Sequence, residues 1–126
     1  MAAGAWEAEL DAAIERWQSG DVDGAIARCI QLSAEFSSEW KVRALCGAYL
    51  YERGDLESAV PHLEAAVELS PASEIPARSL FHAYLDLGRD SDAKRELRRF
   101  HGSTESAKLK KEWARLIRLM DAPIAS

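Results

Sequence analysis

The sequence predicts an all-α fold built from helical hairpins, and three observations support this prediction. Gly20, Gly54 and Gly88 lie 34 residues apart, and an alanine follows each of them five residues later. Between these glycines, apolar residues recur at three- and four-residue spacing, which is typical of amphipathic helices. Each glycine falls where a residue able to adopt the left-handed conformation can end a helix. A fixed period of this length predicts stacked repeats rather than a closed globule.

The first hairpin is predicted over about residues 5–37. Its first helix carries an apolar stripe that begins at Trp6 and ends at Trp17. Asp21 should cap the second helix, because its carboxylate can accept hydrogen bonds from the free amide groups of the first turn. Ala25 should face the first helix, since a short side chain lets paired helices approach closely.

The second hairpin is predicted over about residues 38–71. Gly47 lies inside its first helix, where glycine costs about 1 kcal/mol relative to alanine, so a packing reason is expected. Asp55 repeats the expected capping position. Pro61 lies inside the second helix and should bend its axis, because proline removes one backbone hydrogen bond. Pro71 should end that helix.

The third hairpin is predicted over about residues 72–102, with Ser73 as the expected cap and a break at Gly102. A seventh, amphipathic helix follows over about residues 104–120. Because no fourth hairpin follows it, this helix should cover the last hairpin and present its lysines and arginines to solvent. A frayed tail is expected over residues 121–126.

The middle hairpin also carries a family pattern. Cys46-Gly47, Leu50, Ala59, Leu63 and Pro71 follow the spacing W-x2-L-G-x2-Y…A-x3-F…P, with Arg43 in place of the first aromatic residue. Residues 5–101 therefore resemble three tandem tetratricopeptide repeats. The resemblance implies a single domain over residues 1–126, arranged as a right-handed α-α superhelix of seven antiparallel helices. It also implies that Gly47 lies where a neighbouring helix crosses closely.

Composition and charge limit the possible partners. The net charge of −5 divides into −9 for residues 1–88 (15 acidic, 6 basic) and +4 for residues 89–126 (6 acidic, 10 basic). Nucleic acid is not an expected partner, because polyanion binding needs a continuous basic face. The sequence shows no signal peptide and no apolar run of about 20 residues that could span a membrane, so a cytoplasmic location is expected.

No catalytic or metal-binding motif is recognisable, so we expect neither an enzyme nor a cofactor. Cys29 and Cys46 occupy apolar helical positions and are predicted to be buried thiols. His62, His82 and His101 lie on different helices, and His62 and His101 are expected to be solvated.

The resemblance implies that the first helix of each pair lines a concave groove where a peptide can bind. The residues placed there are Leu10, Ile14, Trp17, Lys41, Ala44, Leu45, Ala48, Tyr51, Ile75, Arg78, Ser79, His82 and Leu85. Trp17, Tyr51 and Leu85 form one column of the repeat. They could either fill the junctions between hairpins or offer an apolar ladder to a partner.

The resemblance also excludes one mode of recognition. Some tetratricopeptide domains hold the acidic tail of a heat-shock chaperone in a clamp of lysine, asparagine and arginine. Here the corresponding positions hold Leu10, Ile14, Leu45, Ile75 and Ser79, and the chain contains no asparagine. An amphipathic helix or an extended apolar segment is the more suitable occupant.

The leading hypothesis is thus a non-catalytic adaptor that binds a partner peptide or helix in the groove. The alternative is a dedicated chaperone, or an immunity-type inhibitor, that binds a secreted bacterial protein through its acidic surface. Self-association through Trp6, Trp17 or the last helix is a third possibility, so the chain is expected to be a monomer or a weak homodimer.

Overall fold

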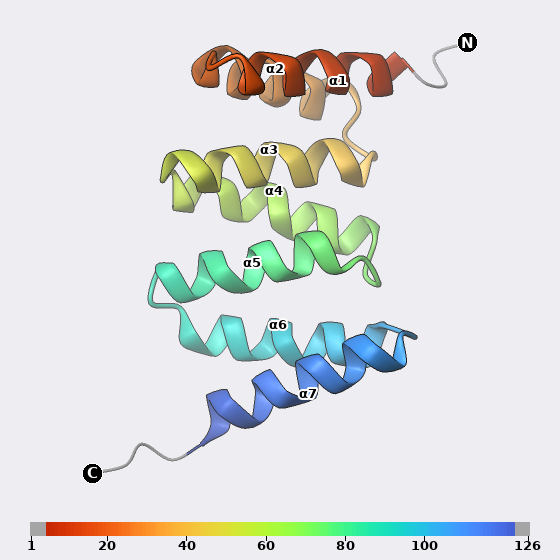
Figure 1. Cartoon of the computed structure of the whole chain (residues 1–126), viewed down its shortest axis with the longest axis vertical. Coiled ribbons are helices and arrows are strands. Elements are labelled where there is room, and N and C mark those ends of the chain that lie inside the picture. The colour runs from red at the N-terminus through yellow and green to blue at the C-terminus, as the bar shows by residue number, and fades with distance from the viewer. Residues whose placement is uncertain (1–4, 123–126) are drawn as a thin grey trace.

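A computed structural model describes residues 5–122, and in that range the chain is entirely helical apart from turns. The helices are α1 (Ala5–Gln18), α2 (Val22–Glu35), α3 (Trp40–Arg53), α4 (Leu56–Leu69), α5 (Glu74–Asp86), α6 (Asp90–Ser103) and α7 (Ala107–Asp121). Consecutive helices are antiparallel and pack on one another, so that three hairpins form a stack with α1 and α7 at opposite ends (Figure 1). The predicted fold class is confirmed.

The turn inside each hairpin has the same backbone geometry. Gly20, Gly54 and Gly88 have φ values of 95°, 92° and 74°, which residues with a Cβ rarely adopt. The amide after each glycine donates to the carbonyl five residues earlier, as in Asp55 N to Leu50 O at 2.9 Å. This is a helix-ending motif that glycine makes possible, and it explains the period of the glycines.

Small residues allow the two helices of a hairpin to pack closely. Ala25, Ala59 and Ala93 occupy the same position of the repeat and are all fully buried. At Gly47 the approach is closer still, because an added Cβ would lie 2.5 Å from Cγ of Leu63. The expected close crossing at this glycine is confirmed.

Only one of the predicted side-chain caps forms. Asp21 accepts a hydrogen bond from Gly24 N at 3.0 Å, as expected. Asp55 lies at the N-cap position of α4 but does not cap it, because Arg53 holds its carboxylate at 2.8 Å. Ser73 does not cap α5 either, since its hydroxyl group lies 2.6 Å from that of Ser70.

The boundary between the third hairpin and the last helix lies later than predicted. α6 continues through Gly102 to Ser103, and α7 begins at Ala107, with Ser106 accepting a hydrogen bond from Leu109 N at 3.2 Å. The predicted break was placed too early because glycine at the end of a helix does not by itself stop it. Residues 123–126 of the expected tail lie outside the described residues.

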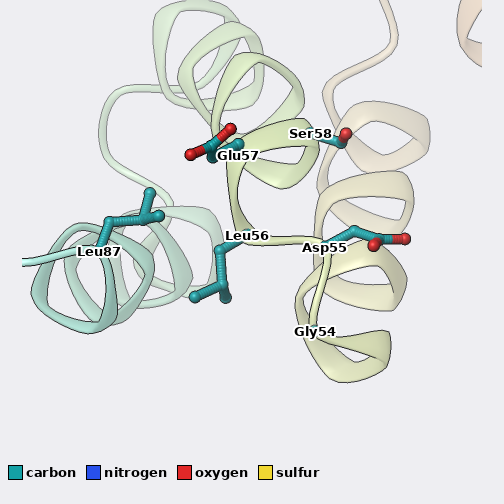
Figure 2. A pocket seen from close by; sticks show the side chains of 6 residues that line it. All are labelled: Gly54, Asp55, Leu56, Glu57, Ser58 and Leu87. Carbon is teal, nitrogen blue, oxygen red and sulfur yellow. The ribbon is translucent and has the colours of Figure 1, made fainter.

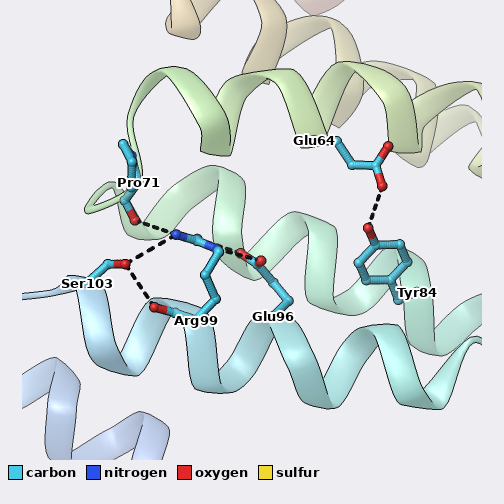
Figure 3. Close-up of polar contacts among 6 residues, drawn as sticks. All are labelled: Glu64, Pro71, Tyr84, Glu96, Arg99 and Ser103. Carbon is cyan, nitrogen blue, oxygen red and sulfur yellow. Dashed lines mark hydrogen bonds and ion pairs between the residues drawn. The ribbon is translucent and has the colours of Figure 1, made fainter.

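Polar contacts join the second hairpin to the third (Figure 3). The Tyr84 hydroxyl group donates to Glu64 at 2.6 Å, and burial together with this hydrogen bond raises the pKa of Tyr84. Arg99 donates to the carbonyl oxygen of Pro71 at 3.0 Å and pairs with the buried carboxylate of Glu96. Each buried polar group at this junction therefore has a partner.

The two cysteines are buried free thiols, as predicted. Burial raises the pKa of Cys29 to about 11 and that of Cys46 to about 12, which keeps both thiols protonated and unreactive at neutral pH. The expectation for His62 was wrong. Its ring is partly buried, with Nδ1 3.5 Å from the guanidinium of Arg43, because α3 and α4 pack closely there.

Candidate functional site: the concave groove

The first helices of the three hairpins form two adjoining hollows. The upper hollow has a volume of about 250 Å³ and lies across α1, α3 and α5. It is lined by Leu10, Trp40, Lys41, Ala44, Leu45, Ala48 and Ile75. Apart from Lys41, these side chains are apolar.

The lower hollow has a volume of about 290 Å³ and lies between α3 and α5. It is lined by Ala48, Tyr51, Glu52, Glu74, Ile75, Arg78, Ser79 and His82. Because Ala48 and Ile75 line both hollows, the two form one continuous depression, which we call the concave groove.

The apolar half of the concave groove is an exposed hydrophobic surface. Ala44 and Ala48 give α3 a low profile at the floor, and Leu10 and Leu45 are only half-buried beside them. Ile75 is 70% exposed, the most exposed large apolar side chain among the described residues. Nothing in the fold requires an isoleucine at such a position, whereas a partner could cover it.

The polar half has charged groups that α7 holds in place. Glu74 pairs with Arg78 at i, i+4, and the buried Trp113 of α7 donates its Nε1–H to the same carboxylate at 3.2 Å. The Arg78 guanidinium lies over the Trp113 ring, 5.5 Å from its centroid. Burial alone would raise the pKa of Glu74, but the hydrogen bonds from Arg78 and Trp113 lower it, so this carboxylate stays ionised.

Tyr51 joins the floor of the groove to the third hairpin. Its hydroxyl group donates to Asp86 at 2.5 Å, and this hydrogen bond, together with partial burial, raises the pKa of Tyr51 to about 12. Tyr51 therefore both lines the lower hollow and holds α3 against α5.

The structure places most of the predicted groove residues together, but three lie outside both hollows. Ile14, Trp17 and Leu85 are partly buried. Trp17 stacks on Tyr49 of α3, with ring centroids 4.0 Å apart and planes 5° from parallel. In the column of Trp17, Tyr51 and Leu85, all three side chains pack against the core, which favours the junction interpretation.

The sequence interpretation omitted three residues that line the groove. Trp40 precedes Lys41 and pairs with Trp6 in the 34-residue period, which was the available signal. Glu74 could have been noticed as the i−4 neighbour of Arg78, where an ion pair stabilises a helix. Glu52 had no comparable signal.

The hollow at the hairpin turns has no catalytic character. It measures about 370 Å³ and lies where the α3–α4 turn approaches the end of α5 (Figure 2). Its lining consists of Gly54, Asp55, Leu56, Glu57, Ser58 and Leu87. Glu57 and Ser58 project from α4 in different directions, so no nucleophile is paired with a base there.

Two further searches concern metals and membranes. Within residues 5–122, no three His, Cys, Asp or Glu side chains are grouped closely enough to hold a metal ion. None of the helices described has both the length and the apolar character needed to cross a bilayer.

Comparisons with known proteins agree with this architecture. Residues 50–100 match the family model described as tetratricopeptide repeat. No curated protein matches the sequence closely enough to be counted as a relative.

Similar solved structures extend the fold likeness over nearly the whole chain. The MamA protein has a TM-score of 0.77 at 17% identity, over 94% of this chain and 63% of MamA, so the chain spans less than two-thirds of that structure. The type III secretion chaperone SycD of Yersinia enterocolitica, solved with a peptide of the translocator YopD, has a TM-score of 0.77 at 14% identity over 90% of each chain. The first repeat domain of Spaghetti (RPAP3), bound to the HSP90 peptide SRMEEVD, has a TM-score of 0.72 at 12% identity over 93% of this chain and 96% of that one.

At these identities the structures share the fold alone, and the family match supplies the rest. With its turn glycines, its buried alanines and this match, the chain is a tetratricopeptide repeat protein of three helical hairpins and a terminal helix.

Proposed function

We propose that the protein binds a segment of another protein in the concave groove and performs no catalysis itself. The observation that carries this proposal is the exposed apolar half of the groove, where the 70% exposed Ile75 adjoins Leu45 and Trp40. Apolar side chains of a partner would cover this surface and remove it from water, at about 25 cal/mol per Å² of apolar area.

The groove chemistry favours an amphipathic or extended apolar segment. Two proteins of the same fold were solved with bound peptides, SycD with a peptide of YopD and RPAP3 with a peptide of HSP90, which supports peptide binding as the role. An acidic chaperone tail is a poor occupant, because Lys41 is the only cation in the upper hollow and Glu74 already pairs with Arg78.

The groove can be tested by selecting binders from a random peptide library and measuring the affinity of the selected peptides by calorimetry. Ile75→Asp should weaken binding about tenfold or more, because it places a charge in the apolar half. Ile30→Asp is the matched control, since Ile30 is 45% exposed on α2 and lies outside both hollows. Equal affinities of the two variants would refute the groove as the binding site.

A second candidate function is a dedicated chaperone or inhibitor of a secreted protein, acting through the acidic surface. The likeness to SycD over 90% of both chains favours keeping this candidate. Residues 1–88 carry a net charge of −9 (15 acidic, 6 basic), which could hold a basic client.

The two functions predict different salt dependence. Binding of a basic client should weaken steeply as ionic strength rises, because exposed charges are screened, whereas apolar binding in the groove should change little. Affinity that stays constant between about 0.05 M and 0.5 M salt would exclude the acidic-surface function.

A further inference from the structure

The first helix carries an acidic stripe that has no cation to neutralise it. Glu7, Asp11 and Glu15 lie at i, i+4 and i+8, all three are exposed, and among residues 5–122 none of them has an ion-pair partner. By contrast, Glu9 on the same helix pairs with Arg28 at 2.5 Å. Like charges at i, i+4 destabilise a helix, so the fold itself gains nothing from this stripe.

The last helix carries a complementary basic stripe. Lys108, Lys111, Arg115 and Arg118 lie at i, i+3, i+7 and i+10, are all exposed, and have no ion-pair partner in the part of the chain that the structure describes. Seven arginines between residues 28 and 99 do contact a carboxylate. The basic stripe is therefore exceptional within this molecule.

The two stripes cannot neutralise each other within one molecule. α1 carries a net charge of −3 (four acidic residues and Arg16), and α7 carries +3 (five basic residues, Glu112 and Asp121). The two helices lie at opposite ends of the stack and make no contact (Figure 1). The acidic stripe would instead oppose the basic stripe if a second copy were placed end to end with the first.

We propose that copies of this chain associate head to tail, with the basic stripe of one copy against the acidic stripe of the next. The exposed Ala8 and Ala12 beside the acidic stripe, and Leu119, 64% exposed beside the basic stripe, would add a small apolar contact. Each copy keeps one stripe free for the next copy, so the contact is heterologous and produces rings or open chains rather than closed two-fold dimers.

Two charge-reversal variants test this arrangement by sedimentation velocity. One reverses the acidic stripe (Glu7→Lys, Asp11→Lys, Glu15→Lys), and the other reverses the basic stripe (Lys111→Glu, Arg115→Glu, Arg118→Glu). The wild-type protein at about 20 mM salt should increase in mass with concentration and should return to a single chain at about 0.5 M salt, where charges are screened. Each variant alone should stay a single chain, because both of its ends then carry the same sign.

An equimolar mixture of the two variants should associate again, since every contact between unlike variants joins opposite charges. Glu57→Lys, Glu68→Lys, Glu105→Lys is the control, because it changes the net charge as the acidic-stripe variant does at exposed positions outside the stripes. This control should associate like the wild type, and circular dichroism should show all variants to be helical. A single-chain wild type at every concentration in low salt, or a mixture no heavier than its components, overturns the proposal, even if the basic stripe binds anionic vesicles.

Discussion

The missing Cβ of Gly47 decides how closely α3 and α4 approach each other. The glycine costs helix stability by its own propensity, about 1 kcal/mol relative to alanine. The structure shows what it gains, because the Leu63 side chain fills the space that a Cβ would occupy, with Leu63 Cγ 2.5 Å from that position. Packing therefore outweighs propensity at this residue.

Gly47→Ala should thus lower the free energy of unfolding by about 1–3 kcal/mol, the usual cost of overpacking. Gly102→Ala is the matched control, since it also lies in a helix but has no atom within 4 Å of an added Cβ. That control should leave stability unchanged or raise it by up to about 1 kcal/mol. Urea unfolding measures both, and an equal effect of the two substitutions would disprove the packing explanation.

His62 should make the protein sensitive to mild acid. Burial, and then the charge of Arg43, lower the pKa of His62 in the folded protein, whereas the unfolded chain takes up the proton near pH 6.5. Unfolding therefore binds a proton below that pH, and the free energy of unfolding should fall as pH drops from about 7 to 5.

His62→Gln should flatten this acid slope, and His82→Gln, at an exposed position, should not. Thermal unfolding at several pH values gives the slopes. If the two variants respond to acid in the same way, carboxylates rather than His62 cause the loss of stability.

At the scale of elements, the 34-residue period predicted everything that each hairpin repeats. It placed the turn glycines and the buried alanines, because these features arise from backbone packing common to every copy. It could not predict contacts that occur only once. The hydrogen bond between Trp113 and Glu74 joins residues 39 positions apart and has no counterpart in the other hairpins.

The apolar pattern was also too broad on α2. Helical spacing predicts that Ile30 points inward with Ile26 and Leu32, but it is 45% exposed. The reason is that α2 packs only on α1 and α3, so its buried stripe is narrower than its apolar one. A sequence shows which residues could be buried but not how many neighbours the fold supplies.

The terminal helix α7 depends on one side chain. Trp113 is fully buried, lies 4.4 Å from the Phe100 ring centroid to centroid, and donates to Glu74. Trp113→Ala should lower the free energy of unfolding by about 3–5 kcal/mol, because it leaves a large cavity under α7.

Trp113→Phe separates the hydrogen bond from the packing. It keeps most of the ring and should cost less than Trp113→Ala, although part of that cost is the lost Glu74 partner, about 1 kcal/mol. Leu119→Ala on the same helix, at a 64% exposed position, should change stability by less than about 0.5 kcal/mol. Chemical unfolding of the three variants would show whether α7 is held through Trp113, and equal losses for Trp113→Ala and Leu119→Ala would refute this.

The whole molecule is a one-dimensional stack, so its stability is a sum of hairpin terms and junction terms. Packed pairs of helices follow the chain order from α1·α2 to α6·α7, with α3·α5 the one pair of non-consecutive helices in substantial contact among those described. The first hairpin is held by its junction with α3, where Trp17 stacks on Tyr49. Weakening that junction should release the first hairpin without opening the others.

Trp17→Ala should therefore increase amide hydrogen exchange in α1 and α2 by about tenfold or more, while exchange in α5 and α6 stays as in the wild type. Trp6→Ala is the matched control, because Trp6 lies on the same helix, is also partly exposed, and has no stacked partner within residues 5–122. It should accelerate exchange in the first hairpin less than Trp17→Ala does. Exchange that rises equally in all seven helices after Trp17→Ala would mean that the stack opens as a single cooperative unit, and the junction at Trp17 would then hold the whole molecule rather than its first hairpin.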